Sequence, residues 1–209
     1  MLFGVPTLYD ALLKAKGMDK IDFSFLKYAV SGGDTLPEKL EKNVNDFLAA
    51  HNCKTKICEG YGMTEGLAAL SLSVAENYKS RTIGKPLLGT EMCIVEPGTV
   101  NVLPADTDGE LCVSGPTIMI GYRNNPEETA NTLRTHADGK TWLHTGDMGY
   151  MRDEEMLYVV GRFKSLLIAL MFTPLKLKVL SNSLILLKNV LLFRFHISIK
   201  KKLQRLISF

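Results

Sequence analysis

Two short apolar runs that each lead into glycines, joined by an amphipathic segment, constrain the fold of this chain most. FLKYAVSGG leads into a glycine loop at 31–34, and KTKICEGYGMTEG leads into a second glycine loop at 59–66. Two strand-and-loop units joined by a helix predict part of a parallel α/β sheet over residues 20 to about 90. Ligands of such sheets bind at the loops that leave the carboxyl ends of the strands, so both loops are expected on one edge.

Helix signals accompany these strands. In TLPEKLEKNVNDFLAAH, Thr35 is the candidate N-cap and Pro37 stands in the first turn. The earlier segment PTLYDALLKA begins with a proline and is predicted to be a helix with Leu8, Leu12 and Leu13 on one face.

The sequence from residue 91 to about 162 predicts mainly strands. GTEMCIVEP and GELCVSGP are β-rich runs between turn residues, and NPEETANTLR is a short helix with two glutamates in its first turn. KTWLHTGDMGYMRDEEMLYVVGR is expected to form a strand, the polar turn RDEE and a returning strand, with Trp142 in the core. This half is therefore more antiparallel than the first.

A change of composition divides the chain. Of its 209 residues 46% are apolar, enough for a globular core, and all 22 acidic residues lie at or before Glu155. Residues 156–209 carry ten Lys and Arg and no acid, which predicts one domain over 1–165 and an atypical basic, apolar tail over 166–209. Lys and Arg residues of the tail interrupt every apolar window of about 20 residues, the length that a membrane-spanning helix needs, so the tail is not expected to span a membrane. It remains open whether the tail lies on an anionic membrane surface or is an abnormal C-terminus, the interpretation that we favour.

The four cysteines, Cys53, Cys58, Cys93 and Cys112, are scattered without a CxxC or a Cys/His pair at ligand spacing. No segment at the N-terminus has the pattern of a secretory signal. We therefore expect a reducing, cytoplasmic location and buried thiols rather than a metal site.

The stretch EGYGMTEG favours nucleotide chemistry. Glycines on either side of Tyr61 let the backbone pass close to a flat ligand, Thr64 can donate to a phosphate oxygen, and Glu65 can bind Mg²⁺. In HTGD, Asp147 can accept both hydroxyls of a ribose, and Arg162 supplies a cation one hairpin later. Taken singly, Asp147 could merely end a strand and Arg162 could merely pair with an acid of the RDEE turn. As a set these residues favour nucleotide binding.

The ordered motifs SGGDTLP, EGYGMTE, GELCVSGP, GYRNNPEET, WLHTGD and YVVGRFKS resemble those of the adenylate-forming superfamily, and most closely those of its acyl-CoA synthetases. The resemblance implies a partial large domain of that α/β fold. It also implies a ligase that uses ATP and Mg²⁺ to convert a carboxylic acid to acyl-AMP and then transfers the acyl group to CoA. The favoured acid is a fatty acid. Its partners would be that acid and ATP or AMP, not nucleic acid. The alternatives are a non-catalytic remnant with residual AMP binding and an adenylation domain that loads a carrier-protein thiol.

The resemblance also implies roles for individual residues. The nucleotide-binding set is Gly32, Gly33, Asp34, Tyr61, Gly62, Asp147 and Arg162. Tyr61 would stack on adenine, and Asp147 would bind the ribose with help from Arg162. Thr64 and Glu65 would be catalytic, Glu65 as the Mg²⁺ ligand, and Lys164 would lie at the hinge of the family's small C-terminal domain. His144 either approaches the ligand or fills a polar position at a strand end.

Two parts of the family pattern have no match in this sequence: a phosphate-binding loop upstream of SGGDTLP and a C-terminal domain bearing a catalytic lysine. We therefore expect a chain that begins in the middle of the large domain and is inactive by itself.

Overall fold

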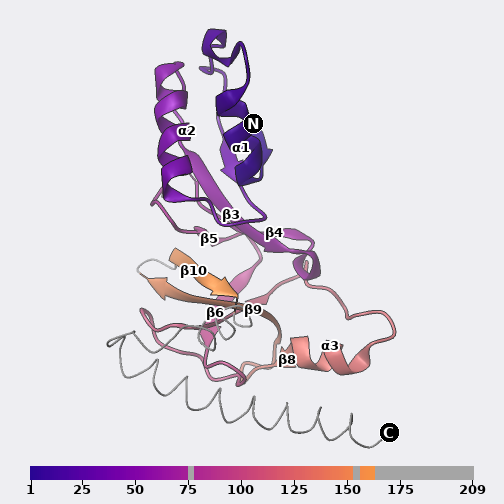
Figure 1. Cartoon of the computed structure of the whole chain (residues 1–209). Coiled ribbons are helices and arrows are strands. Elements are labelled where there is room, and N and C mark those ends of the chain that lie inside the picture. Colours follow the sequence, from indigo (N-terminus) through magenta and orange to yellow (C-terminus); the bar gives the residue numbers. More distant parts are fainter. Residues whose placement is uncertain (75–77, 153–155, 163–209) are drawn as a thin grey trace, which may run out of the picture. The chain divides into compact units, whose positions relative to one another are not determined.

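A computed structural model describes residues 1–74, 78–152 and 156–162, which belong to a compact unit spanning Met1–Phe163 (Figure 1). Its elements are β1 (Leu2–Gly4), α1 (Pro6–Lys14), β2 (Ala29–Ser31), α2 (Glu38–Ala50), β3 (Ile57–Met63), β4 (Ala68–Leu72), β5 (Lys85–Pro86), β6 (Glu91–Val95), β7 (Gly109–Ser114), α3 (Pro126–Thr132), β8 (Leu133–Thr135), β9 (Thr141–Arg152) and β10 (Met156–Arg162), with 3₁₀ turns at Met18–Lys20 and Thr64–Gly66. The predicted tail at 166–209 and its boundary lie outside the described residues and stay predictions.

The first sheet has the order β1-β2-β3-β4-β5. Strands β1, β2 and β3 are parallel, as predicted, but β4 and β5 are antiparallel to their neighbours. The prediction of part of a parallel sheet over residues 20 to about 90 is therefore confirmed for β2 and β3 and wrong for β4 and β5. Only the 3₁₀ turn and Leu67 separate β3 from β4, and so short a connection can join only antiparallel strands, because a parallel pair needs a crossover of a dozen or more residues.

The predicted helices exist, but two details of their interpretation are wrong. Helix α1 buries Tyr9, whose hydroxyl donates to the carbonyl oxygens of Leu2 (3.1 Å) and Val30 (2.9 Å), whereas Leu8 is 43% exposed. The phenol thus ties α1 to β1 and β2, and this turns Leu8 outward. Helix α2 begins after Pro37, with no side-chain cap from Thr35.

The second sheet is antiparallel, with the order β10-β9-β7-β6 and β8 paired to β9. This confirms the strand-rich second half and the short helix α3, which Asn125 caps by accepting a hydrogen bond from the backbone of Glu128 at 3.1 Å. One face of the sheet buries a cluster that includes Leu111, Leu143 and Leu157, together with Leu70 of the first sheet. The other face buries Val95, Cys112 and Trp142, so the predicted core position of the tryptophan is confirmed.

The segment before β5 joins the two sheets. The Thr82 hydroxyl donates to the Leu157 carbonyl at 2.6 Å, the Ile83 amide donates to the same oxygen at 3.0 Å, and the Leu157 amide donates to Gly84 at 3.1 Å. Residues of β3 are thereby held close to β9 and β10.

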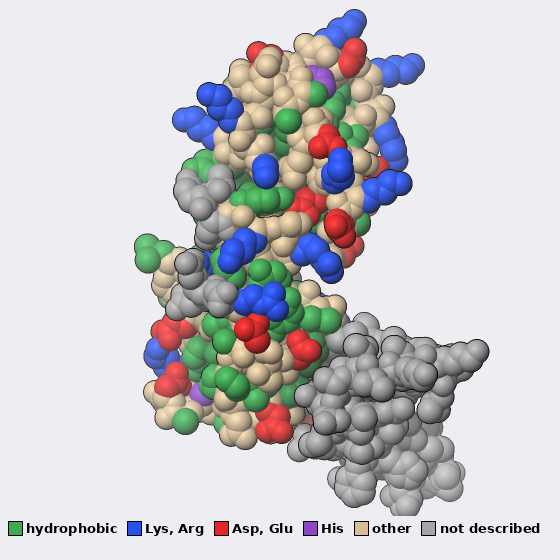
Figure 2. Space-filling view, turned by 90° about the vertical axis from the view of Figure 1, so that its left-hand side faces the viewer, with side chains coloured by type: hydrophobic (Ala, Val, Ile, Leu, Met, Phe, Trp, Pro, Cys, Tyr) green, Lys and Arg blue, Asp and Glu red, His purple; other side chains and the backbone are tan. Residues whose placement is uncertain are grey.

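The surface carries interspersed charges rather than one dominant sign on the face shown in Figure 2. Some are paired along helices, as Lys14 with Asp10 and Lys42 with Asp46, both at 2.5 Å. In the part of the chain that the structure describes, no helix is both long and apolar enough to cross a membrane.

Candidate functional site

Three of the predicted nucleotide-binding residues meet through hydrogen bonds. The Tyr61 hydroxyl on β3 donates to Oδ2 of Asp147 on β9 at 2.7 Å. The Arg162 Nε on β10 donates to Oδ1 of the same carboxylate at 3.2 Å. Arg162 and Asp147 are register partners in the antiparallel β9–β10 pair, so the hairpin sets the cation beside the acid. The sheet junction brings Tyr61 to them although 86 residues separate it from Asp147.

The carboxylate of Asp147 is buried but keeps room for further donors. Its side chain is 9% exposed, and each of its two oxygens accepts one of these hydrogen bonds. An ionised carboxylate offers about four acceptor positions, so one remains on each oxygen for the two hydroxyls of a ribose. Burial and then the negative charge of Asp147 raise the pKa of Tyr61, which therefore stays protonated and acts as the donor.

The simpler interpretation of Asp147 as the end of a strand is wrong, because β9 continues through it from Thr141 to Arg152. Arg162 pairs with Asp147, another member of the predicted nucleotide-binding set, and its side chain is 70% exposed. The Tyr61 ring packs against the core cluster of the second sheet, with its hydroxyl toward Asp147. Stacking of this ring on adenine stays a prediction.

The glycine loop after β2 lies against β3. The Gly32 amide donates to the Gly4 carbonyl at 3.0 Å, and a Cβ on Gly32 would lie 3.2 Å from the carbonyl oxygen of Gly60. Gly33 has a φ of +79°, which favours glycine, and the Asp34 carboxylate accepts the next backbone amide at 2.8 Å. The loop that the sequence predicted to bind adenine thus flanks the strand that carries Tyr61.

The second predicted glycine loop, 59–66, is instead a strand as far as Met63, followed by the 3₁₀ turn. Its glycines serve close packing of strands: a Cβ on Gly62 would lie only 1.6 Å from the carbonyl oxygen of Ala68 on β4. The pairing register shifts between Tyr61 and Gly62. Glu59 binds the loop after β2, because its carboxylate accepts the Leu36 amide at 3.2 Å.

The predicted catalytic pair lies in the turn after β3. Thr64 is exposed, and Glu65 is half-buried with its Oε1 accepting the Tyr122 hydroxyl at 2.8 Å. The Glu65 carbonyl also accepts the Met119 amide at 2.8 Å. Tyr122 and Met119 were missed from the sequence, although Tyr122 stands in the GYRNNPEET motif. The predicted hinge residue Lys164 lies outside the described residues.

Comparisons with known proteins identify the family of this chain. The model of the AMP-binding enzyme family matches residues 1–123. The chain belongs to this family. The 4-coumarate–CoA ligase of Vanilla planifolia is 38% identical over 168 residues, which cover 78% of this chain and 29% of that protein. Luciferin 4-monooxygenase of Luciola mingrelica is 36% identical over 163 residues, covering 78% and 28%.

Solved structures of AMP-binding enzymes share this fold. A long-chain-fatty-acid–CoA ligase from Archaeoglobus fulgidus superposes with a TM-score of 0.70 over 81% of this chain and 36% of its own, at 23% identity. Apo MatB from Rhodopseudomonas palustris gives a TM-score of 0.66 over 78% and 31%, at 27% identity. The predicted superfamily and the partial large-domain α/β fold are confirmed. The chain spans less than a third of the length of the two enzymes from vanilla and firefly.

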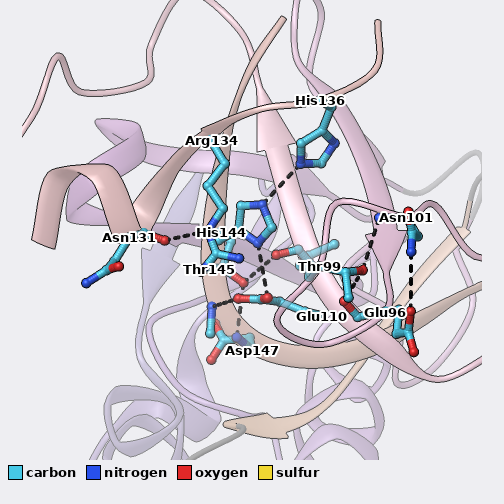
Figure 3. Close-up of polar contacts among 12 residues, drawn as sticks. Glu96, Thr99, Asn101, Glu110, Asn131, Arg134, His136, His144, Thr145 and Asp147 are labelled. Atoms are coloured by element: carbon cyan, nitrogen blue, oxygen red, sulfur yellow. Dashed lines mark hydrogen bonds and ion pairs between the residues drawn. The ribbon is translucent and has the colours of Figure 1, made fainter. Parts of the chain in front are cut away.

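A buried polar network of Glu110, His144 and Thr145 lies next to Asp147 (Figure 3). Glu110 on β7 accepts the Gly146 amide at 3.1 Å through Oε1 and contacts His144 Nδ1 at 3.1 Å through Oε2. The Asp147 amide donates to the Thr145 hydroxyl at 3.1 Å. The sequence missed Glu110, although it stands in the GELCVSGP motif. His144 is a buried member of this network rather than a filler at a strand end.

The residues of the turn fit a magnesium ion bound together with a nucleotide. Mg²⁺ commonly takes one or two carboxylates with phosphate oxygens and waters completing its shell, and Glu65 supplies one carboxylate next to the exposed Thr64. Bound there, the ion would neutralise charge on the phosphates.

Proposed function

We propose that this chain carries the ribose-binding and Mg²⁺-binding side of an ATP-dependent acid–thiol ligase, which activates a carboxylic acid as acyl-AMP and passes the acyl group to CoA. The observation that carries the proposal is the meeting of Tyr61 and Arg162 at the Asp147 carboxylate. In this scheme Asp147 accepts the two ribose hydroxyls, Thr64 donates to the α-phosphate, and Glu65 binds Mg²⁺.

The preorganised carboxylate favours recognition of a ribose. Tyr61 and Arg162 hold both oxygens of Asp147 in place before a ligand arrives, so little side-chain freedom is lost on binding. Hydrogen bonds to a charged acceptor contribute about 1.5–3 kcal/mol each. The 2′-deoxy analogue lacks one of these two bonds, so the protein should prefer the ribonucleotide by the free energy of that bond.

For the acid we propose a fatty acid, the class that the motif resemblance favours. A 4-coumarate-like aryl acid is the second candidate, because the vanilla relative that is 38% identical is named for 4-coumarate. We further propose that the 209-residue chain by itself binds AMP without turning over. Electrostatic groups at reacting phosphates are commonly worth about 10²- to 10³-fold each in rate, and this sequence matches neither the family's phosphate loop nor its C-terminal lysine.

The binding test is a calorimetric titration of the purified chain with AMP and with 2′-deoxy-AMP. We expect AMP to bind at least about tenfold more tightly, since tenfold corresponds to about 1.4 kcal/mol. Asp147→Asn should abolish this preference. The matched control is Asp106→Asn, which removes an exposed carboxylate in the turn before β7, paired at 2.7 Å with Arg152 of β9, and should change nothing. Equal affinity of the wild type and Asp147→Asn for AMP would refute the ribose role.

The activity test follows pyrophosphate release from ATP and Mg²⁺ with a panel of fatty acids and 4-coumarate, with and without CoA. We expect no turnover from this chain alone. Turnover that disappears in Glu65→Ala would overturn the proposed inactivity, support the catalytic role of Glu65, and identify the acid by the substrate that gives it.

A further inference from the structure

A second group of chemically active side chains lies on the face of the antiparallel sheet that carries Trp142. Cys112, His136 and His144 each offer a sulfur or nitrogen atom, and these three atoms lie within 4.8 Å of one another. Cys112 is fully buried, and the two histidines are 7% and 6% exposed. Neither the nucleotide site nor the proposed ligase chemistry uses the thiol or His136.

The sheet register brings these residues together. Cys112 on β7 and His144 on β9 are direct cross-strand partners, and Cys93 on β6 is the partner of Cys112 on its other side. A row of two thiols and an imidazole therefore crosses three strands on one face. His136 follows β8, and its ring stacks on Trp142 with centroids 5.1 Å apart.

The two imidazoles face each other through their Nε2 atoms, which lie 3.1 Å apart (Figure 3). Two nitrogens bound to one tetrahedral zinc ion at about 2.05 Å would lie roughly 3.4 Å apart. To bind the ion, the two nitrogens would therefore move a few tenths of an ångström apart, His136 Nε2 would lose its proton, and both lone pairs would turn toward the metal.

A carboxylate already orients one of the imidazoles in the manner of a metal ligand. Glu110 Oε2 lies 3.1 Å from His144 Nδ1, so the proton of the neutral ring sits on Nδ1 and the lone pair on Nε2 points to His136. Glu110 itself is fixed by the Gly146 amide. Carboxylate, histidine and metal in this order form a recurrent arrangement of zinc sites.

The second ring nitrogen of His136 is not satisfied by the contact with His144. This atom, Nδ1, is buried and has no hydrogen-bond partner among the described residues. With His144 Nε2 as an acceptor, His136 must donate from Nε2 and leave a bare lone pair on Nδ1. A zinc ion bound to Nε2 would shift the ring proton to Nδ1, which would then be a buried donor rather than a bare acceptor.

We propose that Cys112, His136 and His144 bind a zinc ion. Cys93, the cross-strand partner of Cys112, is not among the three converging ligand atoms, and its thiol would turn toward the ion to become the fourth ligand. The site draws on sulfur and nitrogen donors, which suit Zn²⁺ and not the oxygen-seeking Mg²⁺ or Ca²⁺. Two thiolates would neutralise the charge of the ion within a buried environment. All of its ligands are buried except Cys93, which is half-buried, so the site is closed and structural. The ion would link strands β6, β7 and β9 close to Asp147.

The test is metal binding by the untagged 209-residue chain under reducing conditions, with Co²⁺ and Zn²⁺ as probes. We expect one ion per chain, a thiolate-to-cobalt charge-transfer absorption, and loss of this absorption when Zn²⁺ displaces Co²⁺. Zn²⁺ should also raise the melting temperature, and a chelator should reverse the rise.

Substitutions separate the site from adventitious binding. His136→Asn and Cys112→Ser should each weaken Co²⁺ binding by at least about tenfold, and Cys112→Ser should also reduce the charge-transfer band. Glu110→Gln keeps all four ligands and should weaken binding by about 10- to 100-fold, so it decides the question if a ligand variant does not fold. His51→Asn and Cys53→Ser, which both follow the last residue of α2, are the matched controls and should bind as the wild type does.

Two results would overturn the proposal. One is a wild-type chain that retains no Zn²⁺ after exposure to excess metal and desalting. The other is binding that is unaffected by His136→Asn and Glu110→Gln, or equally weakened by the two controls, which would identify an adventitious ion only.

Discussion

The hydrogen bond between Tyr61 and Asp147 should contribute much more to stability than the ion pair between Arg162 and the same carboxylate. Tyr61→Phe removes only the hydroxyl that donates at 2.7 Å to a carboxylate whose side chain is 9% exposed. A hydrogen bond to a charged group contributes about 1.5–3 kcal/mol, and the substitution leaves a buried acceptor with one donor fewer. We therefore expect Tyr61→Phe to lower the free energy of unfolding by about 1.5–3 kcal/mol.

Arg162→Gln removes an ion pair that is longer, at 3.2 Å, and the arginine side chain is 70% exposed. Solvent screening limits such pairs to about 0–1 kcal/mol. The expected order of destabilisation is therefore Tyr61→Phe well above Arg162→Gln, although both side chains contact the same carboxylate.

Urea unfolding monitored by fluorescence of Trp142, the single tryptophan, which is 5% exposed, gives both values. Tyr28→Phe, at a tyrosine that is 40% exposed, is the control and should be neutral. The double variant Tyr61→Phe/Asp147→Asn should be less unstable than the sum of the single variants by at least about 0.5 kcal/mol. Equal costs for Tyr61→Phe and Arg162→Gln, or full additivity in the double variant, would refute this assignment of the stabilising contact.

Three further changes test the fold around the site. Burial raises the pKa of Glu59 above its ordinary value of 4.5, so the contribution of this group to stability is complete below pH 4.5 and is lost as pH rises through the raised pKa. Glu59→Gln should therefore raise the melting temperature at pH 7 but not at pH 4. An equal effect at both pH values would contradict the burial of the carboxylate. Gly62→Ala should destabilise by about 1–3 kcal/mol or more in urea unfolding, because the new Cβ would lie 1.6 Å from the Ala68 carbonyl oxygen, and a neutral result would show that β4 does not pack so closely. Leu143→Ala, at a fully buried position, should cost about 2–5 kcal/mol in the same assay, whereas a cost below 1 kcal/mol would place this side chain outside the core.

The sequence by itself determined the elements and their class. Apolar runs such as AVS and GELCVS predicted β2 and β7, and the prolines at the starts of PTLYDALLKA and PEETANT predicted α1 and α3. These signals are local, because strand and helix periodicity and turn residues act over a few neighbouring positions. The ordered motifs also determined the family, since each preserves a short run of residues.

Only the tertiary structure decided which residues meet. Tyr61 and Asp147 lie 86 positions apart and are joined by the junction of two sheets, and Gly62 is required by a strand that returns against it, not by a loop. The sequence interpretation set aside a metal site at the cysteines because no Cys/His pair stood at short spacing. In the structure Cys112 and His144 are neighbours by strand register. A register is fixed by burial of whole sheet faces, and that is a property of the assembled core that no local pattern of residues contains.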